Sequence, residues 1–200
     1  IIDGVADTPE RRDKYLRTIY TKANDMDRLI NELTYYSSID NNRIPYNFHR
    51  INVAEFFADC VEDVGLDLES KNIQLNYSNL VEPDTRIIAD PEQLKKVINN
   101  IIGNSIKYMD KEKGVIDIRL LDEVDSIRVE IEDNGKGIAQ KDLQKIFERF
   151  YRVDKSHSRE TGGTGLGLSI VKHGALLHNA EIHVESEEGK GTKMELIFHC

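Results

Sequence analysis

The sequence predicts an α+β fold: an α/β sandwich preceded by a long bundle-forming helix. First, a stretch of roughly thirty residues without Gly or Pro carries one apolar stripe at helical spacing. Second, the remaining sequence mixes helical and alternating patterns in an order that is neither strictly β-α-β nor all-β. Third, the turn-rich segment 40–45 separates these two parts. We therefore expect two domains, residues 1–44 and 45–200.

The long helix is expected to begin at Pro9, because Thr8 can cap it and proline fits the first helical position. It continues to about Ser38. Its apolar stripe consists of Tyr15, Leu16, Ile19, Ala23, Met26, Leu29, Ile30, Leu33 and Tyr36. A single helix of this kind is not stable alone in water, so we expect it to pack on another helix or a second copy. The alternative is an ordinary core helix of a single domain.

The second part is expected to alternate irregularly between helices and strands. Asp90 and Pro91 mark the start of a helix that runs to about Met109. The segments 115–121 and 126–132 are expected to form a hairpin, with a turn around 122–125. The other expected helices cover 53–68, 140–150 and 166–177, and the other strands cover 73–77, 86–89, 181–186 and 192–198.

Composition limits the possible partners. The net charge of −9 argues against nucleic acid, because phosphate backbones require a basic face. No apolar run approaches the ~18 residues needed to span a bilayer, so no membrane contact is expected for this fragment. Cys60 and Cys200 have neither metal-ligand nor redox spacing, which favours a reducing, cytoplasmic setting. With no initial Met and no signal segment, the chain looks like a fragment of something longer.

The helix that begins at Pro91 carries a polar stripe. Asn100 and Asn104 are one turn apart and Lys107 lies one turn beyond, next to an apolar face. Two amides and an ammonium beside a core-facing surface are costly unless they are paired. A charged ligand provides partners, because amide oxygens can coordinate Mg²⁺ and Lys107 can meet phosphate. The alternative is that these side chains simply lie at the solvent edge.

Two glycine-containing segments add to this pattern. Asp133 follows a strand and begins Asp-Asn-Gly-Lys-Gly, in which the glycines permit close approach of a flat ligand and the carboxylate can accept from an amine such as that of adenine. The segment 162–169, Gly-Gly-Thr-Gly-Leu-Gly-Leu-Ser, opens a helix and can present N–H groups to phosphate. A plain turn and a flexible hinge are the respective alternatives.

A fourth segment, 146–152, precedes a polar stretch, 154–163, that we interpret as a mobile lid. The positive side chains of these two stretches, Arg149, Arg152, Lys155 and Arg159, can bind phosphate oxygens, or they can form a solvated charged face.

The four segments occur in one order, Asn-x₃-Asn-x₂-Lys, Asp-x-Gly-x-Gly, Phe-x-x-Phe and Gly-x-Gly-x-Gly. This order resembles the N, G1, F and G2 boxes of the ATP-binding domain of sensor histidine kinases. The resemblance covers the chain from about Ile51 to the end, and it implies a two-layer α/β sandwich in which helices cover one face of a mixed sheet.

The resemblance implies specific roles on the polar side of the site. Asn100 would hold Mg²⁺, Asn104 and Lys107 would contact phosphates, and Tyr108 would lie along the nucleotide. Arg152 looks like the lid arginine that reaches the γ-phosphate. We expect Asn100, Lys107 and Arg152 to be the catalytic residues, with ATP and Mg²⁺ as substrate and cofactor.

The resemblance also implies the base and phosphate contacts. Asp133 would bind the adenine amine, with Gly135 and Gly137 beside it, and Thr192 would support the adenine end. The phosphate cradle would consist of Gly163, Thr164, Gly165, Leu166 and Gly167. The implied partners are a second copy, through the helical hairpin of which residues 1–39 look like the tail, and a response-regulator receiver domain. The whole protein would be a bacterial plasma-membrane sensor with this part in the cytoplasm.

One departure from the family pattern concerns the phosphoacceptor. The family places it in a His-(Glu/Asp)-x-(Arg/Lys)-Thr-Pro segment, and none of the six histidines has that context: His49, His157, His173, His178, His183 and His199. We therefore expect the acceptor to lie upstream and this chain alone not to autophosphorylate. Two other functions stay open, an ATPase or serine kinase on the same scaffold and a non-catalytic dimeric interaction module. Asn100 counts against hydrolysis, because an amide cannot accept a proton.

Overall fold

The computed structural model describes residues 8–40, 43–69, 71–153 and 163–199. The chain divides into two compact units. The first comprises Ile1–Ile44 with Ser156–Thr164, and the second comprises Pro45–Lys155 with Gly165–Cys200. Within the described ranges, no helix combines the length and the apolar character that crossing a bilayer requires.

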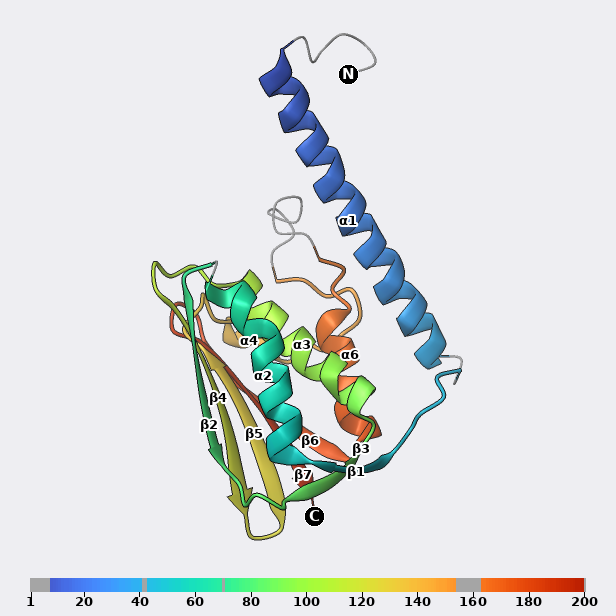
Figure 1. Ribbon diagram of the computed structural model, residues 1–200, viewed down its shortest axis with the longest axis vertical. Coiled ribbons are helices and arrows are strands. Elements are labelled where there is room, and N and C mark those ends of the chain that lie inside the picture. Colours follow the sequence, from blue (N-terminus) through green and yellow to red (C-terminus); the bar gives the residue numbers. More distant parts are fainter. Residues whose placement is uncertain (1–7, 41–42, 70, 154–162, 200) are drawn as a thin grey trace. The chain divides into compact units, whose positions relative to one another are not determined.

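Helix α1, Pro9–Asp40, makes up most of the first unit (Figure 1). It begins as expected, since the Thr8 hydroxyl accepts a hydrogen bond from the Arg11 N–H at 3.3 Å. The Thr8 carbonyl accepts the first helical bond, from Arg12, at 3.0 Å. Much of the predicted apolar stripe is exposed, including Tyr15, Leu16, Ile19, Met26, Ile30 and Leu33.

The second unit is built on a mixed five-stranded sheet with the strand order β2-β4-β5-β7-β6. The strands are β2 Ile73–Leu80, β4 Gly114–Glu123, β5 Ser126–Asp133, β6 Ala180–Glu187 and β7 Gly191–His199. Strand β2 pairs with β4 in parallel, while the other neighbours are antiparallel. The predicted hairpin is therefore confirmed, as is the mixed sheet.

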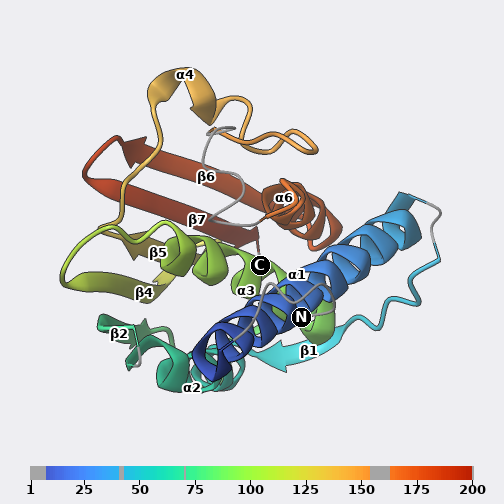
Figure 2. The ribbon, with the colours of Figure 1, turned by 90° about the horizontal axis from the view of Figure 1, so that it is seen from above.

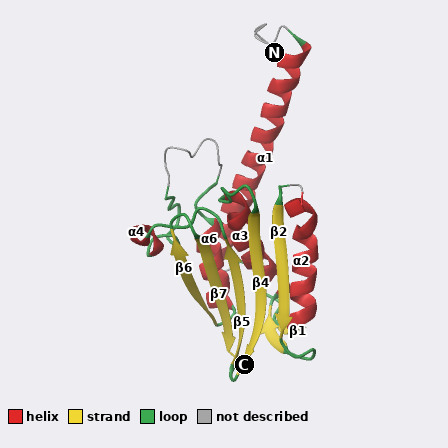
Figure 3. Ribbon diagram, turned by 90° about the vertical axis from the view of Figure 1, so that its left-hand side faces the viewer, coloured by secondary structure: helices red, strands yellow, loops and turns green. Residues whose placement is uncertain are grey.

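Three helices cover one face of this sheet (Figure 3): α2 Val53–Glu69, α3 Pro91–Lys107 and α6 Gly167–Leu177. Helix α3 lies between the other two and packs mainly on α6 (Figure 2). The apolar residues of α3 join those of β4, β5 and β7 in one core, which includes Ile98, Ile102, Ile118, Val129 and Leu196. The expected α/β sandwich is confirmed.

The other face of the sheet carries charged side chains, because neighbouring residues of a strand point to opposite faces. Arg119 of β4 donates to Glu130 of β5 at 2.8 Å, and Lys193 of β7 lies 3.0 Å from Glu195. These ion pairs let a polar face coexist with the apolar core on the opposite side.

Two elements differ from the sequence prediction. A short strand that was not predicted, β1 His49–Asn52, pairs outside the main sheet with β3, Arg86–Ala89, whose own bounds were predicted correctly. Helix α4 covers only Gln140–Leu143, so the prediction of a helix over 140–150 was wrong after residue 143. Turns with hydrogen bonds between residues three apart follow it, such as the bond from the Lys145 N–H to the Asp142 carbonyl at 2.8 Å.

Candidate functional site

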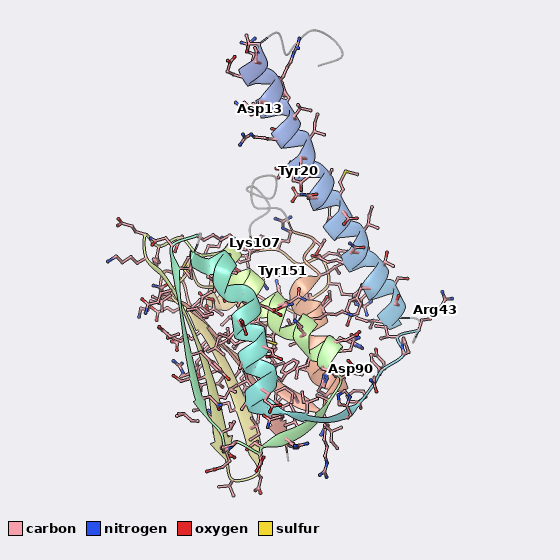
Figure 4. All side chains as sticks on the ribbon, in the orientation of Figure 1. Asp13, Tyr20, Arg43, Asp90, Lys107 and Tyr151 are labelled. Atoms are coloured by element: carbon pink, nitrogen blue, oxygen red, sulfur yellow. The ribbon has the colours of Figure 1, made fainter. Side chains whose placement is uncertain are left out.

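Helix α3 positions the predicted polar stripe. Its start is fixed by Asp90, whose carboxylate accepts from the Gln93 N–H at 3.1 Å, and by Pro91 in the first turn. Asp90 and Lys107 mark the two ends of the helix in Figure 4. The apolar face of α3 is buried, so its register on the sheet is fixed. Asn100, Asn104 and Lys107 then share the adjoining, half-buried stripe.

The amide of Asn100 has a defined orientation. Its Nδ2 donates to the Lys96 carbonyl at 2.8 Å, one turn earlier in the helix. Its Oδ1 faces the start of α6, since a Cβ added at Gly167 would lie 2.9 Å from that oxygen. The absence of a side chain at Gly167 thus lets the first turn of α6 approach this amide closely.

Tyr108 caps the C-terminal end of α3, and two ammonium groups lie over its ring. The Nζ atom of Lys107 is 5.0 Å from the centre of its ring, and that of Lys136 is 4.8 Å away. The Tyr108 carbonyl also accepts from the Lys136 N–H at 3.2 Å. These contacts tie the segment after β5 to the end of α3 and gather positive charge there.

Asp133, the last residue of β5, is held from several sides. Its Oδ2 accepts from the Ser105 hydroxyl at 2.7 Å and its Oδ1 from the Gly135 N–H at 2.9 Å. Burial raises the pKa of Asp133, whereas hydrogen bonds from Ser105, Gly135 and Thr192 lower it. Thr192 is the register partner of Asp133 on β7.

The two glycines after Asp133 are required by close packing. A Cβ at Gly135 would lie 2.8 Å from the Tyr108 carbonyl oxygen. Gly137 has a φ of 68° and approaches the Glu187 carbonyl so closely that a Cβ would lie 2.0 Å from it. The segment is therefore a tight turn pressed between α3 and the β6–β7 connection, and the close approach of a flat ligand to it stays a prediction.

The start of α6 also depends on glycine. Gly165 has a φ of 75° and packs on the backbone of Phe150, and Leu166 is fully buried. Gly163 and Thr164 group with the first unit, where the Thr164 hydroxyl donates to the Glu32 carboxylate. Of the predicted phosphate cradle, the second unit thus contains Gly165, Leu166 and Gly167.

The rest of the predicted lid is only partly described. Arg152 is half-buried, and the segment 154–162, which includes most of the predicted lid, lies outside the described residues. Among the described histidines, His178 is buried and serves packing, since its Nε2 accepts from the Asp90 N–H at 3.1 Å and its Nδ1 lies 2.7 Å from the Gly174 carbonyl oxygen. His157 lies in the undescribed segment.

Two residues next to the site, Ser105 and Lys136, were not identified from the sequence. A serine inside an apolar helical pattern gives no signal of its own, because its bond to Asp133 depends on how α3 packs on β5. The approach of Lys136 to Tyr108 likewise depends on the turn after β5.

The described ranges contain no group of three or more His, Cys, Asp or Glu side chains placed to hold a metal ion. A cation here would therefore take most of its oxygen ligands from elsewhere, such as a phosphate-bearing ligand and water. The oriented amide oxygen of Asn100 fits such an arrangement for Mg²⁺.

Comparison with known proteins points to one family. Residues 89–200 match the family described as "Histidine kinase-, DNA gyrase B-, and HSP90-like ATPase". The chain is 31% identical over 193 residues to the sensor histidine kinase WalK of Bacillus subtilis (strain 168), and the match covers 96% of this chain and 31% of WalK. The chain thus spans about a third of the length of this relative.

Solved structures show the same fold. The catalytic domain of the histidine kinase ThkA superposes with a TM-score of 0.65 and 25% sequence identity, over 76% of this chain and 95% of that domain. ThkA in complex with the response regulator protein TrrA gives a TM-score of 0.74 at 22% identity, over 96% of this chain and 52% of that one.

Proposed function

Because the chain belongs to the family of histidine kinase-, DNA gyrase B- and HSP90-like ATPases, we propose that it is the ATP-binding catalytic part of a sensor histidine kinase. In this proposal residues 45–200 bind ATP and direct its γ-phosphate to a histidine side chain. Residues 1–44 are the end of a dimerising helical hairpin that carries this histidine.

The observation that best supports the proposal is that one helix contacts both glycine-containing segments. Ser105 of α3 binds Asp133 at 2.7 Å, and Asn100 of α3 faces Gly167 of α6. Asp133 can then accept from the adenine amine while the polar stripe of α3 and the first turn of α6 face the phosphates. Because α3 makes both contacts, one helix would hold the base-recognising carboxylate and the phosphate-facing segment in a fixed relation.

The polar stripe fits phosphoryl transfer. Lys107 and Asn104 would contact phosphate oxygens, with Tyr108 along the nucleotide and Thr192 at the adenine end. Mg²⁺ would be held by the Asn100 oxygen together with phosphate oxygens, and it would supply charge neutralisation when bound. Arg152 would add a second positive charge at the γ-phosphate. Gly163 and Thr164 would complete the cradle that Gly165, Leu166 and Gly167 begin.

The amide at position 100 favours transfer over hydrolysis. An amide cannot accept a proton, so Asn100 cannot activate water as a carboxylate there could. A histidine acceptor needs no such help, because a neutral imidazole nitrogen is already a nucleophile near neutral pH. The γ-phosphate is therefore preserved for transfer.

The remaining partners follow from the relatives. The complex of ThkA with a response regulator supports a receiver domain as the next acceptor in the relay. The exposed stripe of α1 supports a homodimer through the helical hairpin. The name "sensor histidine kinase" of WalK, of which the match covers 31%, supports a longer protein that also has a sensing part. In this proposal the longer protein lies in a bacterial plasma membrane, with the present part on the cytoplasmic side.

A transfer assay tests the proposal. Extended by its upstream segment with the acceptor histidine, the protein should incorporate phosphate from labelled ATP in an acid-labile, base-stable form, whereas the present chain should incorporate almost none. Asn100→Asp should lower transfer at least about tenfold, because it adds negative charge next to the phosphates, which corresponds to about 1.4 kcal/mol in the barrier. The neighbouring, exposed Asn99 offers a control, and Asn99→Asp should leave transfer unchanged.

Two results would contradict this assignment. Acid-stable phosphoserine would identify a serine kinase on the same scaffold. Release of inorganic phosphate, without labelling of the extended protein, would identify an ATPase.

Nucleotide binding by Asp133 is tested separately. Asp133→Asn should weaken ATP binding about tenfold or more in calorimetry, because a hydrogen bond to a charged acceptor contributes roughly 1.5–3 kcal/mol. The variant should keep the fold, since an amide can still accept from the Gly135 N–H and donate to the Ser105 oxygen. Unchanged affinity would remove Asp133 from the site.

A further inference from the structure

Ser105 is a buried hydroxyl for which no role has been assigned so far. It lies on α3 between Asn104 and Lys107, and only 5% of its surface is exposed. Its hydroxyl donates to Oδ2 of Asp133 at 2.7 Å. Asp133 is also the residue to which the proposed function gives the base of the nucleotide, so this bond joins the phosphate-facing helix to the base-recognising carboxylate.

The bond fixes how the carboxylate points. Because the Gly135 N–H binds Oδ1 and the Ser105 hydroxyl binds Oδ2, each oxygen has a defined donor, and the backbone of Thr192 adds a third hydrogen bond to the carboxylate. Rotation of the carboxylate breaks these bonds. The lone pairs that remain can then accept from a ligand in one fixed direction.

The bond also favours one protonation state. Burial raises the pKa of Asp133, and the hydrogen bond from Ser105 is the first of the interactions that oppose this increase. An ionised carboxylate only accepts, whereas a protonated one can also donate. An acceptor-only group selects a purine with an amine at C6 over a purine with a carbonyl there.

We propose that Ser105 is a positioning residue for base recognition: it holds Asp133 oriented and acceptor-only, so that the site selects 6-amino over 6-oxo purine nucleotides. This inference rests on the proposed function, because it assumes that Asp133 meets the base. Ser105 itself does not contact the nucleotide in this scheme.

The test is calorimetry with ATP and with inosine triphosphate, which has a carbonyl at C6. Ser105→Ala should weaken ATP binding by about three- to tenfold, the usual range for one hydrogen bond, and leave the inosine nucleotide almost unaffected. The pH below which ATP affinity is lost should move upward in Ser105→Ala, because the pKa of Asp133 rises when this bond is removed. Ser105→Thr, which keeps the hydroxyl, should restore both properties.

Ser126 provides a matched control. It is also a buried serine whose hydroxyl donates to a carboxylate, that of Glu123 at 3.1 Å, but it lies at the opposite end of β5 from Asp133. Ser126→Ala should change neither nucleotide affinity nor its pH dependence. A purely structural role for Ser105 predicts the same result for both variants, or an equal loss for both nucleotides in Ser105→Ala.

The possible failures are distinguishable. If Asp133→Asn weakens ATP binding but Ser105→Ala changes neither the ATP affinity nor the preference for the 6-amino group, the positioning role is wrong and the proposed function stands. If Asp133→Asn leaves ATP binding unchanged, the base assignment is wrong and the role of Ser105 with it. If Ser105→Ala does not fold, Ser105→Cys, similar in size but a weak donor, should show the same selective loss for ATP.

Discussion

Helices α1 and α3 carry the same kind of apolar stripe but bury it to very different degrees. In α3, Leu94 is 1% exposed and Ile98 is fully buried, whereas in α1 Ile30 is 58% exposed and Leu33 is 48% exposed. Both sequences place apolar residues three and four apart, so the difference does not come from the pattern.

The difference lies in what the chain provides as a partner. The stripe of α3 packs on β5 and on the neighbouring helices α2 and α6. A 32-residue helix that keeps most of its stripe exposed needs a surface from another segment or another copy. Helical periodicity therefore predicts that a face will be buried, but not what buries it.

The largest expected effect comes from the same substitution in both helices. Ile98→Ala should lower the free energy of unfolding by about 2–5 kcal/mol, because it leaves a cavity in the core. Ile30→Ala should change it by less than about 0.5 kcal/mol, because the side chain is already exposed in the monomer. Urea denaturation followed by circular dichroism, at a protein concentration that keeps the chain monomeric, measures both.

Equal losses in the two variants would contradict the comparison. The intrinsic preference for helix changes in the same way in both, so it cannot produce the difference. A large effect of Ile30→Ala in the monomer would mean that α1 is part of a single cooperative core, which was the alternative interpretation of its stripe.

The second prediction concerns the surface that would cover the exposed apolar stripe of α1, namely that of a second copy of the chain. Leu33→Glu should weaken self-association by at least about tenfold, or about 1.4 kcal/mol, because it places a charge in the apolar interface. Sedimentation equilibrium over a range of concentrations measures this change. Asn24→Glu adds the same charge at an exposed polar position of α1 and should have little effect. A wild-type chain that stays monomeric at every concentration would contradict a dimer through α1.

The same distinction between local and distant causes explains how much the sequence could predict. The start of α3 was predictable because its signal, Asp90 followed by Pro91, is local and acts on the next turn. The β4–β5 hairpin was predictable because its two strands alternate and lie next to each other in sequence. The four-residue strand β1 was missed, since its partner β3 lies more than thirty residues away and it has little apolar pattern.

The residues of the candidate site also fall into two groups, those with a local sequence signal and those without one. Asn100, Asp133 and Gly167 could be proposed as site residues because each belongs to a motif with characteristic spacing. Ser105 could not, because its importance arises only when α3 packs on the end of β5. The helix predicted over 140–150 was wrong after Leu143, where turns with hydrogen bonds between residues three apart follow, and the sequence gives no Gly or Pro there as a warning.

The smallest expected effect concerns how the two helices begin. The Asp90 carboxylate is 3% exposed and accepts from the N–H groups of Gln93 and, at 2.7 Å, of Asn47. The Thr8 hydroxyl is exposed and accepts only a long bond of 3.3 Å from Arg11, among the described residues. Asp90→Ala should therefore lower the free energy of unfolding by about 1 kcal/mol, and Thr8→Ala by less than about 0.5 kcal/mol.

Asp90→Asn distinguishes the helix-capping bond of this side chain to Gln93 from its second bond, to Asn47. An asparagine is as good a cap as an aspartate and keeps an acceptor for Gln93, but its Nδ2 cannot accept from the Asn47 N–H. Thermal unfolding should place Asp90→Asn between the wild type and Asp90→Ala, because one of the two bonds is retained. If Asp90→Asn is instead as unstable as Asp90→Ala, the bond to Asn47 supplies the stability, and the start of α3 is important chiefly because it holds the segment that follows residue 45.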